Sequence, residues 1–435
     1  MKPVFSDHFE NIQPSVIRVA QIIFSKRKDG VKAINAAIGN VTLPIHPAMF
    51  DKMKHLTGQE SPFAQGEVSY SATIGISEAN KTLLHVMQAS GIDTKLLFSQ
   101  ITDGGSMAME LVLAGISGRV KNTERPILTI DPTYANYNSF AKRLRRKTVS
   151  ITRTLNNNGL FELPKEEEIV KAIKRYKPNA VLIIPYDNPT GQHWLFDELI
   201  GLTKIAVKNN LWIVSDEAYR ELYFTKKKPV SIWSITEKMV PGITGRRISI
   251  ESASKVWNAC GLRIGAVVTD NFEFHEKCVA EQTANLCANT IGQYVYTGLL
   301  DETKKDLSAW FRSQRGYYKS LIEKTVSAFK SLDKRLIVSL PESSIYSVVD
   351  VKNITGSNFD ATDFVKYCAK YGKVKMDDTY WTLLVSPMSG FYNSSKDKKK
   401  ASTKMRLAYT ETPDKIEKIP HLFMTLLLDY LRQKK

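Results

Sequence analysis

The stretch Val181-Leu182-Ile183-Ile184, followed by Pro185-Tyr186-Asp187-Asn188-Pro189-Thr190-Gly191, shows the pattern that decides the fold. An apolar run of strand length stops abruptly at polar and turn-forming residues, and a helical pattern follows it. The same order occurs where Leu211–Val214 leads into Ser215-Asp216-Glu217-Ala218-Tyr219. Short, unbroken apolar runs that alternate with helices are typical of parallel strands that are buried on both faces of a sheet.

Five successive units between residues 96 and 255 share this pattern. The other three apolar runs are 96–101, 127–130 and 248–250. In an open parallel sheet, ligands bind beyond the carboxyl ends of the strands. The sequence therefore predicts an α/β fold, a mostly parallel sheet with helices on both faces, and one site that is assembled from five loops.

The pattern changes after about residue 300. A long helical stretch, 301–332, precedes short strands near 337–340 and 346–351, and an amphipathic helix near 416–432 closes the chain. We expect a large domain over residues 48–300, and a smaller α+β domain formed by residues 1–47 and 301–435. The Ser/Lys/Asp-rich segment 393–403 is expected to be an exposed loop.

Composition excludes several functional classes. The chain has 435 residues, of which 43% are hydrophobic and 24% charged, and this is ordinary for a globular protein. Its net charge of +17 is scattered in short runs without a nucleic-acid-binding motif, so no nucleic-acid partner is expected. No apolar run could cross a membrane, and no apolar stretch of the signal-peptide type follows the first residues. The four cysteines lack metal-ligand spacing, so we expect reduced thiols, no metal and a cytoplasmic location.

Glycines and hydroxyls suggest an anion site. Gly104-Gly105-Ser106-Met107 lies between a predicted strand and a helix expected to begin near Ser106, where backbone N–H groups and the helix dipole favour an anion. Ser252, Ser254 and Arg263 could hold a phosphate beside Lys255, a candidate Schiff-base nucleophile. Taken singly, a plain turn and a surface lysine are the simpler interpretations.

Other polar residues at the strand ends could complete the site. A buried Asp216 would need a cationic partner, such as a protonated pyridine nitrogen, although it could also cap a helix. Tyr219 and Asn188 could donate to a phenolic oxygen, and Tyr134 could stack on a planar ring. Arg406, in an apolar segment, could bind a carboxylate or lie on an edge strand facing water. The chain contains neither a GxxxxGK[ST] phosphate loop nor a GxGxxG dinucleotide fingerprint after a strand.

In this order, the segments resemble the class I/II aminotransferases, the fold-type-I family of pyridoxal-phosphate enzymes that includes aspartate aminotransferase. The resemblance runs from about Ile34 to Tyr409. Each motif is modest, but the ordered set is highly specific. The motifs are Tyr70 with Gly75, Gly104-Gly105-Ser106 with Ala108, Pro132-Thr133-Tyr134, Asn188-Pro189-Thr190-Gly191, Asp216-Glu217-Ala218-Tyr219, Ser252-Ala253-Ser254-Lys255 with Gly261-Leu262-Arg263-Ile264-Gly265, and Arg406-Leu407.

The resemblance implies a role for each matching residue. Lys255 would form the Schiff base with pyridoxal 5'-phosphate and move the substrate proton, and Asp216 would pair with the ring nitrogen. The phenolic oxygen would be held by Tyr219 and Asn188, and the ring would stack on Tyr134. The phosphate would be bound by Gly105, Ser106, Met107, Ser252, Ser254 and Arg263.

The resemblance also implies the substrate contacts and the assembly. Arg406 would bind the substrate carboxylate, and Gly39 would lie in the segment that covers the substrate. Tyr70 would reach the phosphate of a neighbouring subunit, which makes the implied active unit a homodimer. Segment 271–300 has no arginine, whereas one branch of the family uses an arginine there to select dicarboxylates.

The implied reaction is transfer of an amino group from an L-α-amino acid to a 2-oxo acid such as 2-oxoglutarate. Aspartate and aromatic amino acids are the candidate donors. The same fold also carries β-eliminating C–S lyases, cyclases and decarboxylases, and the motifs do not separate these reactions. A cofactor-binding regulator and a generic α/β binding protein are the remaining alternatives.

Overall fold

A seven-stranded sheet forms the centre of the structure, a computed structural model that describes residues 3–434. The strand order is β2-β12-β11-β10-β9-β5-β6. Only β12 runs antiparallel to its neighbours, so the prediction of a mostly parallel sheet is confirmed. The strands are β2 (Phe98–Asp103), β5 (Ile127–Asp131), β6 (Thr148–Thr152), β9 (Ala180–Ile183), β10 (Trp212–Asp216), β11 (Arg247–Ser252) and β12 (Ile264–Thr269).

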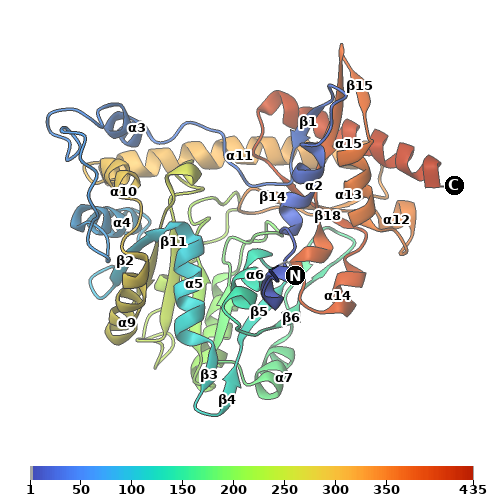
Figure 1. Cartoon of the computed structure of the whole chain (residues 1–435). Helices are drawn as coiled ribbons and strands as arrows, with labels where there is room; N and C mark the ends of the chain where they lie inside the picture. Colours follow the sequence, from blue (N-terminus) through green and yellow to red (C-terminus); the bar gives the residue numbers. More distant parts are fainter. Residues whose placement is uncertain (1–2, 435) are drawn as a thin grey trace.

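Two layers of helices bury both faces of this sheet. In β9, Val181 and Ile183 join one hydrophobic core, whereas Ala180 and Leu182 join the other. The first core includes residues of α4 (Ser77–Ala89), α7 (Glu166–Tyr176) and α8 (Phe196–Lys208). The second includes α5 (Gly104–Ile116), α6 (Asn136–Arg143) and α9 (Phe272–Gln282), and Figure 1 shows α5 lying across the sheet. Because side chains alternate along a strand, burial of both faces requires the continuous apolar runs in the sequence.

A second region contains two smaller sheets. One has four antiparallel strands in the order β13-β14-β18-β17, and the other has the order β1-β16-β15. Strand β1 pairs in parallel with β16, so the start of the chain lies among the C-terminal strands (Figure 1). The strands are β1 (Lys32–Asn35), β13 (Ile337–Val338), β14 (Tyr346–Asp350), β15 (Val374–Met376), β16 (Thr379–Leu384), β17 (Ser386–Pro387) and β18 (Lys404–Ala408).

The long helix α11 (Lys304–Leu332) extends from the side of the large sheet to the C-terminal helices (Figure 1). There it packs on α15 (Pro413–Lys434), while α13 (Ala361–Lys370) packs on α2 (Val16–Phe24). The remaining elements used below are α10 (Thr290–Tyr296), β7 (Thr154–Leu155), β8 (Phe161–Glu162) and α14 (Ser395–Lys400).

The expected loop at 393–403 is wrong in part, because α14 forms within it. The Ser394 hydroxyl accepts the Asp397 N–H at 3.1 Å and so caps the start of the helix. Asp397 lies in the first turn, and lysines 398, 399 and 400 lie in the last turn. These charges interact favourably with the helix dipole. Together with the cap, they stabilise a helix in a segment whose composition suggested a loop.

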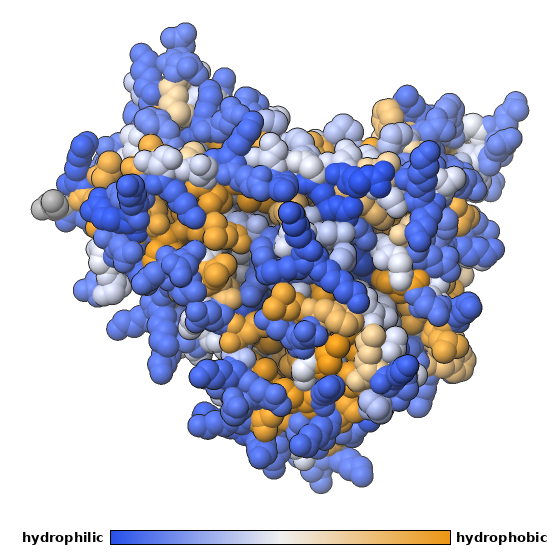
Figure 2. Space-filling view, turned by 180° about the vertical axis from the view of Figure 1, so that it is seen from behind, coloured by the Kyte–Doolittle hydropathy of each residue, from blue (hydrophilic) through white to orange (hydrophobic). Residues whose placement is uncertain are grey.

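Hydrophilic side chains cover much of the surface seen from behind in Figure 2, with hydrophobic residues gathered between them in the lower middle. This distribution agrees with charge that is scattered over solvated faces. Within residues 3–434, no helix combines the length and the apolar composition needed to cross a membrane.

The aromatic core beneath α15 gives a test of the packing. Phe423 is fully buried, and its ring lies 5.5 Å from that of Phe329 and 5.8 Å from that of Phe364. We expect Phe423→Ala to lower the free energy of unfolding by about 3–5 kcal/mol, because it leaves a cavity between three helices. Urea denaturation followed by circular dichroism measures the change. Leu428→Ala, on an exposed part of the same helix, should change it by less than about 1 kcal/mol, and equal losses would contradict the assignment of this core.

Candidate functional site

A cavity of about 520 Å³ lies at the carboxyl ends of β10 and β11 and at the start of α5. Its volume is within the usual range of small-molecule sites. Twelve of the residues predicted from the sequence line it, so the strand ends do meet in one place. They are Gly39, Gly105, Ser106, Tyr134, Asn188, Asp216, Tyr219, Ser252, Ser254, Lys255, Arg263 and Arg406.

Lys255 projects into this cavity from the turn that follows β11. Its ammonium group donates a hydrogen bond to the carbonyl of Gly39, which belongs to the N-terminal segment. A side chain at position 39 would collide with the Tyr346 hydroxyl, so glycine is required where the segment passes over the lysine. The N-terminal segment therefore forms one wall of the cavity and fixes the end of Lys255.

Asp216, the last residue of β10, is held by hydrogen bonds without a countercharge. One carboxylate oxygen accepts the Tyr137 hydroxyl, and the other accepts the Ala218 N–H at 3.1 Å. Burial raises the pKa of Asp216, and these two donors oppose the shift. Among the described residues, no Lys, Arg or His nitrogen lies within 4.0 Å of its carboxylate. A positively charged ligand atom beside the Asp216 carboxylate would supply the missing countercharge.

The start of α5 has the properties of an anion site. The helix begins at Gly104, two residues before the predicted start, and the Asp103 side chain does not cap it. The Asp103 carboxylate instead accepts the Asn289 N–H at 2.9 Å, which leaves the first N–H groups of the helix uncapped. A side chain at Gly265 would collide with the backbone of Gly104 and Gly105, so β12 approaches this turn closely only because it carries glycine there.

Arg263 and two serines surround this helix start. Arg263 has a left-handed backbone with φ of 57°, and its guanidinium donates to the carbonyl of Cys260 at 3.0 Å. The Ser254 N–H donates to the Ser252 hydroxyl at 3.1 Å, which keeps both serines on one turn. A guanidinium, two hydroxyls and free helix N–H groups together form a donor set that suits a phosphate.

Arg406 lies in β18, an inner strand of the four-stranded sheet, and only 1% of its surface is exposed. The alternative of an edge-strand arginine facing water is therefore wrong. Its guanidinium donates to Asn188 Oδ1 at 2.9 Å and to the carbonyl of Ala37 at 2.6 Å, and its Nε has no partner among the described residues. A buried guanidinium without a carboxylate partner is suited to binding an anion that enters the cavity.

Aromatic residues form the remaining wall. The Tyr219 hydroxyl lies 2.8 Å from that of Tyr346, whose ring also stacks 4.2 Å from the Arg406 guanidinium. Burial raises the pKa of Tyr219 well above its usual value, so its hydroxyl remains a proton donor near neutral pH. Tyr134 accepts a hydrogen bond from the Asn136 amide at 2.8 Å.

Two predicted residues lie outside the cavity. Met107 packs against the hydrophobic core that includes α5 and does not line the cavity, so only its backbone remains available to the predicted anion site. Tyr70 is 78% exposed and does not line the cavity of this chain. Its predicted contact with a neighbouring subunit stays a prediction.

Sequence reasoning missed several lining residues. Tyr137 follows the predicted Tyr134 by one helical turn, and this spacing could have identified it. Ser15, Ile17 and Arg18 come from the start of the chain, and Tyr346 comes from β14. No local motif marks these four positions, because only the pairing of distant segments brings them to the site.

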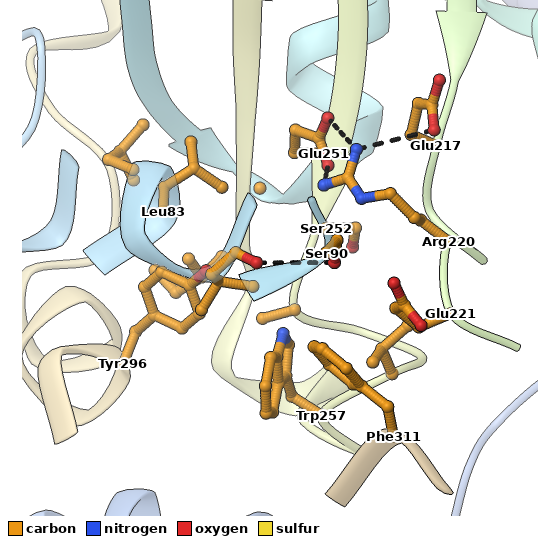
Figure 3. Close-up of a pocket in the computed structure, with 16 residues that line it drawn as sticks. Leu83, Ser90, Glu217, Arg220, Glu221, Glu251, Ser252, Trp257, Tyr296 and Phe311 are labelled. Atoms are coloured by element: carbon orange, nitrogen blue, oxygen red, sulfur yellow. Dashed lines mark hydrogen bonds and ion pairs between the residues drawn. The ribbon is translucent and has the colours of Figure 1, made fainter. Parts of the chain in front are cut away.

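A buried charge network supports the site from behind (Figure 3). Arg220 donates to both carboxylate oxygens of Glu251, at 2.9 and 2.5 Å, and its guanidinium lies 3.5 Å from Glu217. Glu217 follows Asp216, and Glu251 precedes Ser252. The arginine therefore ties the ends of β10 and β11 together at the position where both strands deliver residues to the cavity.

Comparisons with known proteins identify a matching family, similar sequences and a similar fold. The sequence model of the family aminotransferase class I and II matches residues 35–390. The chain is 25% identical over 358 residues to a probable aspartate aminotransferase of Methanocaldococcus jannaschii, covering 80% of this chain and 85% of that protein. It is 26% identical over 296 residues to aromatic-amino-acid aminotransferase 2 of Thermococcus litoralis, covering 66% and 69%. A single mutant of Thermus thermophilus aspartate aminotransferase has a similar fold, with a TM-score of 0.77, 19% identity and coverage of 98% and 100%.

The network around Arg220 can be tested by removing the arginine side chain. Arg220→Ala should lower the free energy of unfolding by about 3–5 kcal/mol at neutral pH, because two buried carboxylates lose their partner. Burial already raises the pKa of Glu217, so the folded variant takes up protons as the pH falls and its deficit shrinks. Urea denaturation at several pH values measures this.

The matched control is Lys319→Ala, which breaks an exposed pair with Glu323 at 3.8 Å. It should cost no more than about 0.5 kcal/mol at any pH. A loss at Arg220→Ala that did not exceed this control would show that the network does not stabilise the two strand ends.

Proposed function

Because the chain belongs to the class I and II aminotransferase family and is an aminotransferase, we propose that it carries out amino transfer in the cavity between β10, β11 and α5. Pyridoxal 5'-phosphate is the proposed cofactor, and Lys255 is its covalent anchor. One observation carries this proposal. Lys255, the unpaired carboxylate of Asp216 and the uncapped start of α5 open into the same cavity, and they match the amine, the ring nitrogen and the phosphate of one molecule.

The residues present fit this cofactor. Gly105, Ser106, the backbone of Met107, Ser252, Ser254 and Arg263 would hold the phosphate. Tyr134 would stack on the ring, and Asn188 with Tyr219 would hold its phenolic oxygen. Pyridoxal phosphate, when bound, supplies an electron sink for the electrons of a broken bond at the substrate Cα.

Asp216 would keep the ring nitrogen protonated. A carboxylate with a raised pKa and no protein cation gains from an added positive charge, and pairing would lower its pKa again. The Tyr137 hydroxyl favours the ionised carboxylate, so Tyr137 acts as a positioning residue for Asp216.

Lys255 and Arg406 would act on different groups of the substrate. The Lys255 amine, once unprotonated, can take the proton from the substrate Cα and return it on the other side of the reaction. Arg406 would bind the α-carboxylate, with Asn188 and the segment at Gly39 defining where that carboxylate lies. Because that segment crosses over Lys255, the substrate would be enclosed and water kept away from the reacting atom.

The proposed donors are aspartate or aromatic L-α-amino acids, with a 2-oxo acid such as 2-oxoglutarate as acceptor. Relatives named for aspartate and aromatic substrates support both classes of donor, and Ile17, Tyr134, Tyr137 and Phe140 give the cavity wall an apolar and aromatic side. These relatives are transaminases, so the C–S lyase alternative is not favoured.

We also propose a domain organisation, an oligomeric state and a cellular location. Residues 48–300 would form the cofactor-binding domain, and residues 1–47 with 301–435 the small domain. Pairing of β1 with β16 supports the second assignment. The exposed Tyr70 supports a homodimer in which it reaches the neighbouring site. We further propose that the protein works in the cytoplasm.

The covalent anchor is tested by visible absorbance. The wild-type protein with pyridoxal phosphate should show a band that decreases with a reactive amino acid and returns with a 2-oxo acid. Lys255→Ala should lack this cycle and lose at least about a hundredfold in rate, because its general base is missing. Lys305→Ala, at an exposed position, should behave as the wild type. A spectrum of Lys255→Ala identical to the wild type would contradict the proposal, and release of pyruvate and ammonia without an acceptor would indicate a lyase.

The support of Asp216 is tested by Tyr137→Phe. Loss of a hydrogen bond to a charged group costs about 1.5–3 kcal/mol, so the pKa of Asp216 should rise by about 1–2 units. Since Asp216 works as a carboxylate, the acid limb of the rate profile should move to higher pH by that amount. Initial rates across the acid range measure the shift, with Tyr367→Phe on α13 as the control. An unchanged profile would exclude this role for Tyr137.

A further inference from the structure

The cavity proposed for amino transfer contains one cation to which the proposed function gives no role. Among the described residues, four cationic side chains line this cavity, whereas Asp216 is the only carboxylate in its lining. The four cations are Arg18, Lys255, Arg263 and Arg406. In the proposed function, Arg263 holds the phosphate, Arg406 binds the α-carboxylate, and Lys255 is joined to the cofactor. Arg18 is therefore left for a further anionic group.

The guanidinium of Arg18 is not neutralised within the protein. Its Nη1 donates to Oε1 of Gln21, one turn further along α2, at 3.4 Å, which is long for a hydrogen bond of this kind. Among the described residues, Arg18 forms no ion pair, and its side chain is exposed. The guanidinium can therefore turn toward an anion without breaking a charge pair.

Hydrogen bonds hold the start of α2 against the wall of the cavity. The Ser15 hydroxyl donates to Asn136 Oδ1 at 3.0 Å, and the Asn136 amide donates to the Tyr134 hydroxyl at 2.8 Å. Ile17 is buried in a hydrophobic core against which Tyr134 also packs. Because Arg18 follows Ile17 directly, its backbone has a fixed place beside Tyr134, although its side chain is exposed.

The charge of Arg18 acts on the interior of the cavity. Burial raises the pKa of Tyr134 to about 12, and the positive charges of Arg406 and Arg18 oppose this shift. Tyr134 is the residue proposed to stack on the cofactor ring. Because the interaction between charges weakens with distance, both guanidinium groups lie near the place where a substrate would meet that ring.

We propose that Arg18 binds the second carboxylate of a dicarboxylic substrate, an L-α-amino acid such as aspartate or glutamate and the corresponding 2-oxo acid. This inference rests on the proposed function, because Arg406 would hold the α-carboxylate of the same molecule. A guanidinium binds a carboxylate by two parallel, charge-assisted hydrogen bonds, and a neutral side chain cannot match their strength. An aromatic substrate would instead contact Tyr137 and Phe140, so Arg18 selects among substrates and takes no part in bond breaking.

Kinetics of the first half-reaction test this role. The cofactor-loaded protein is mixed with aspartate, asparagine or phenylalanine without a 2-oxo acid, and the decrease of the cofactor band is followed. In Arg18→Gln, the second-order rate constant with aspartate should fall at least about tenfold, whereas those with asparagine and phenylalanine should stay within about twofold. The control Arg119→Gln removes the same charge from the exposed part of β3 (Gly118–Val120) and should leave all three within about twofold of the wild type. A preference for aspartate over asparagine that survives Arg18→Gln, or equal losses in both variants, would overturn the proposal.

Equilibrium binding separates this role from turnover. Succinate carries a carboxylate at both ends of its chain and butyrate at one end, and isothermal titration of the cofactor-loaded protein compares them without a reaction. We expect succinate to bind at least about tenfold more tightly than butyrate, and Arg18→Gln to remove most of this difference. Equal affinity of the wild type for both acids would overturn the role of Arg18, even where phenylalanine is transaminated. Binding of succinate that depends on Arg18, in a protein that reacts with no amino acid, would support Arg18 and contradict the proposed function.

Discussion

A carboxylate at the end of a buried strand, without a cation of its own, constrains the rest of this structure. Burial raises the pKa of Asp216, while hydrogen bonds from the Tyr137 hydroxyl and the Ala218 N–H favour the charged carboxylate. Behind it, Glu217 and Glu251 share the single cation of Arg220. The end of β10 therefore holds more carboxyl groups than cations, and a cationic ligand at the cavity would stabilise the charged form of Asp216.

The start of the chain completes the site at the opposite wall. The carbonyl of Gly39 accepts Lys255, and the carbonyl of Ala37 accepts Arg406, so one short segment orients both cationic side chains. Pairing of β1 with β16 holds that segment against the C-terminal strands. Separation of the two regions would thus release the amine and the guanidinium together, which couples opening of the cavity to loss of its two cationic contacts.

The sequence predicts a site residue best where a local pattern also fixes the place of that residue in the sheet. Continuous apolar runs mark strands buried on both faces, and residues directly after them, such as Asp216 and Lys255, must meet because parallel strands end at one edge. The sequence did not predict Tyr346 and Arg18, because they reach the cavity through pairing of distant segments. Helix α14 was not predicted either, because capping by Ser394 stabilises a helix in a segment whose composition is typical of loops.

Two buried arginines bind neighbouring side chains of one loop. Arg153 binds Asp187, and Arg406 binds the next side chain along, Asn188. The loop is further fixed by the Thr190 N–H and hydroxyl, which donate to Asp187 at 3.0 and 2.6 Å. Because Asn188 lines the cavity proposed for amino transfer, these contacts fix the position of one of its wall residues. Arg153 itself lies outside that cavity, so the position of Asn188 depends on a buried ion pair that does not contact the substrate side of the site.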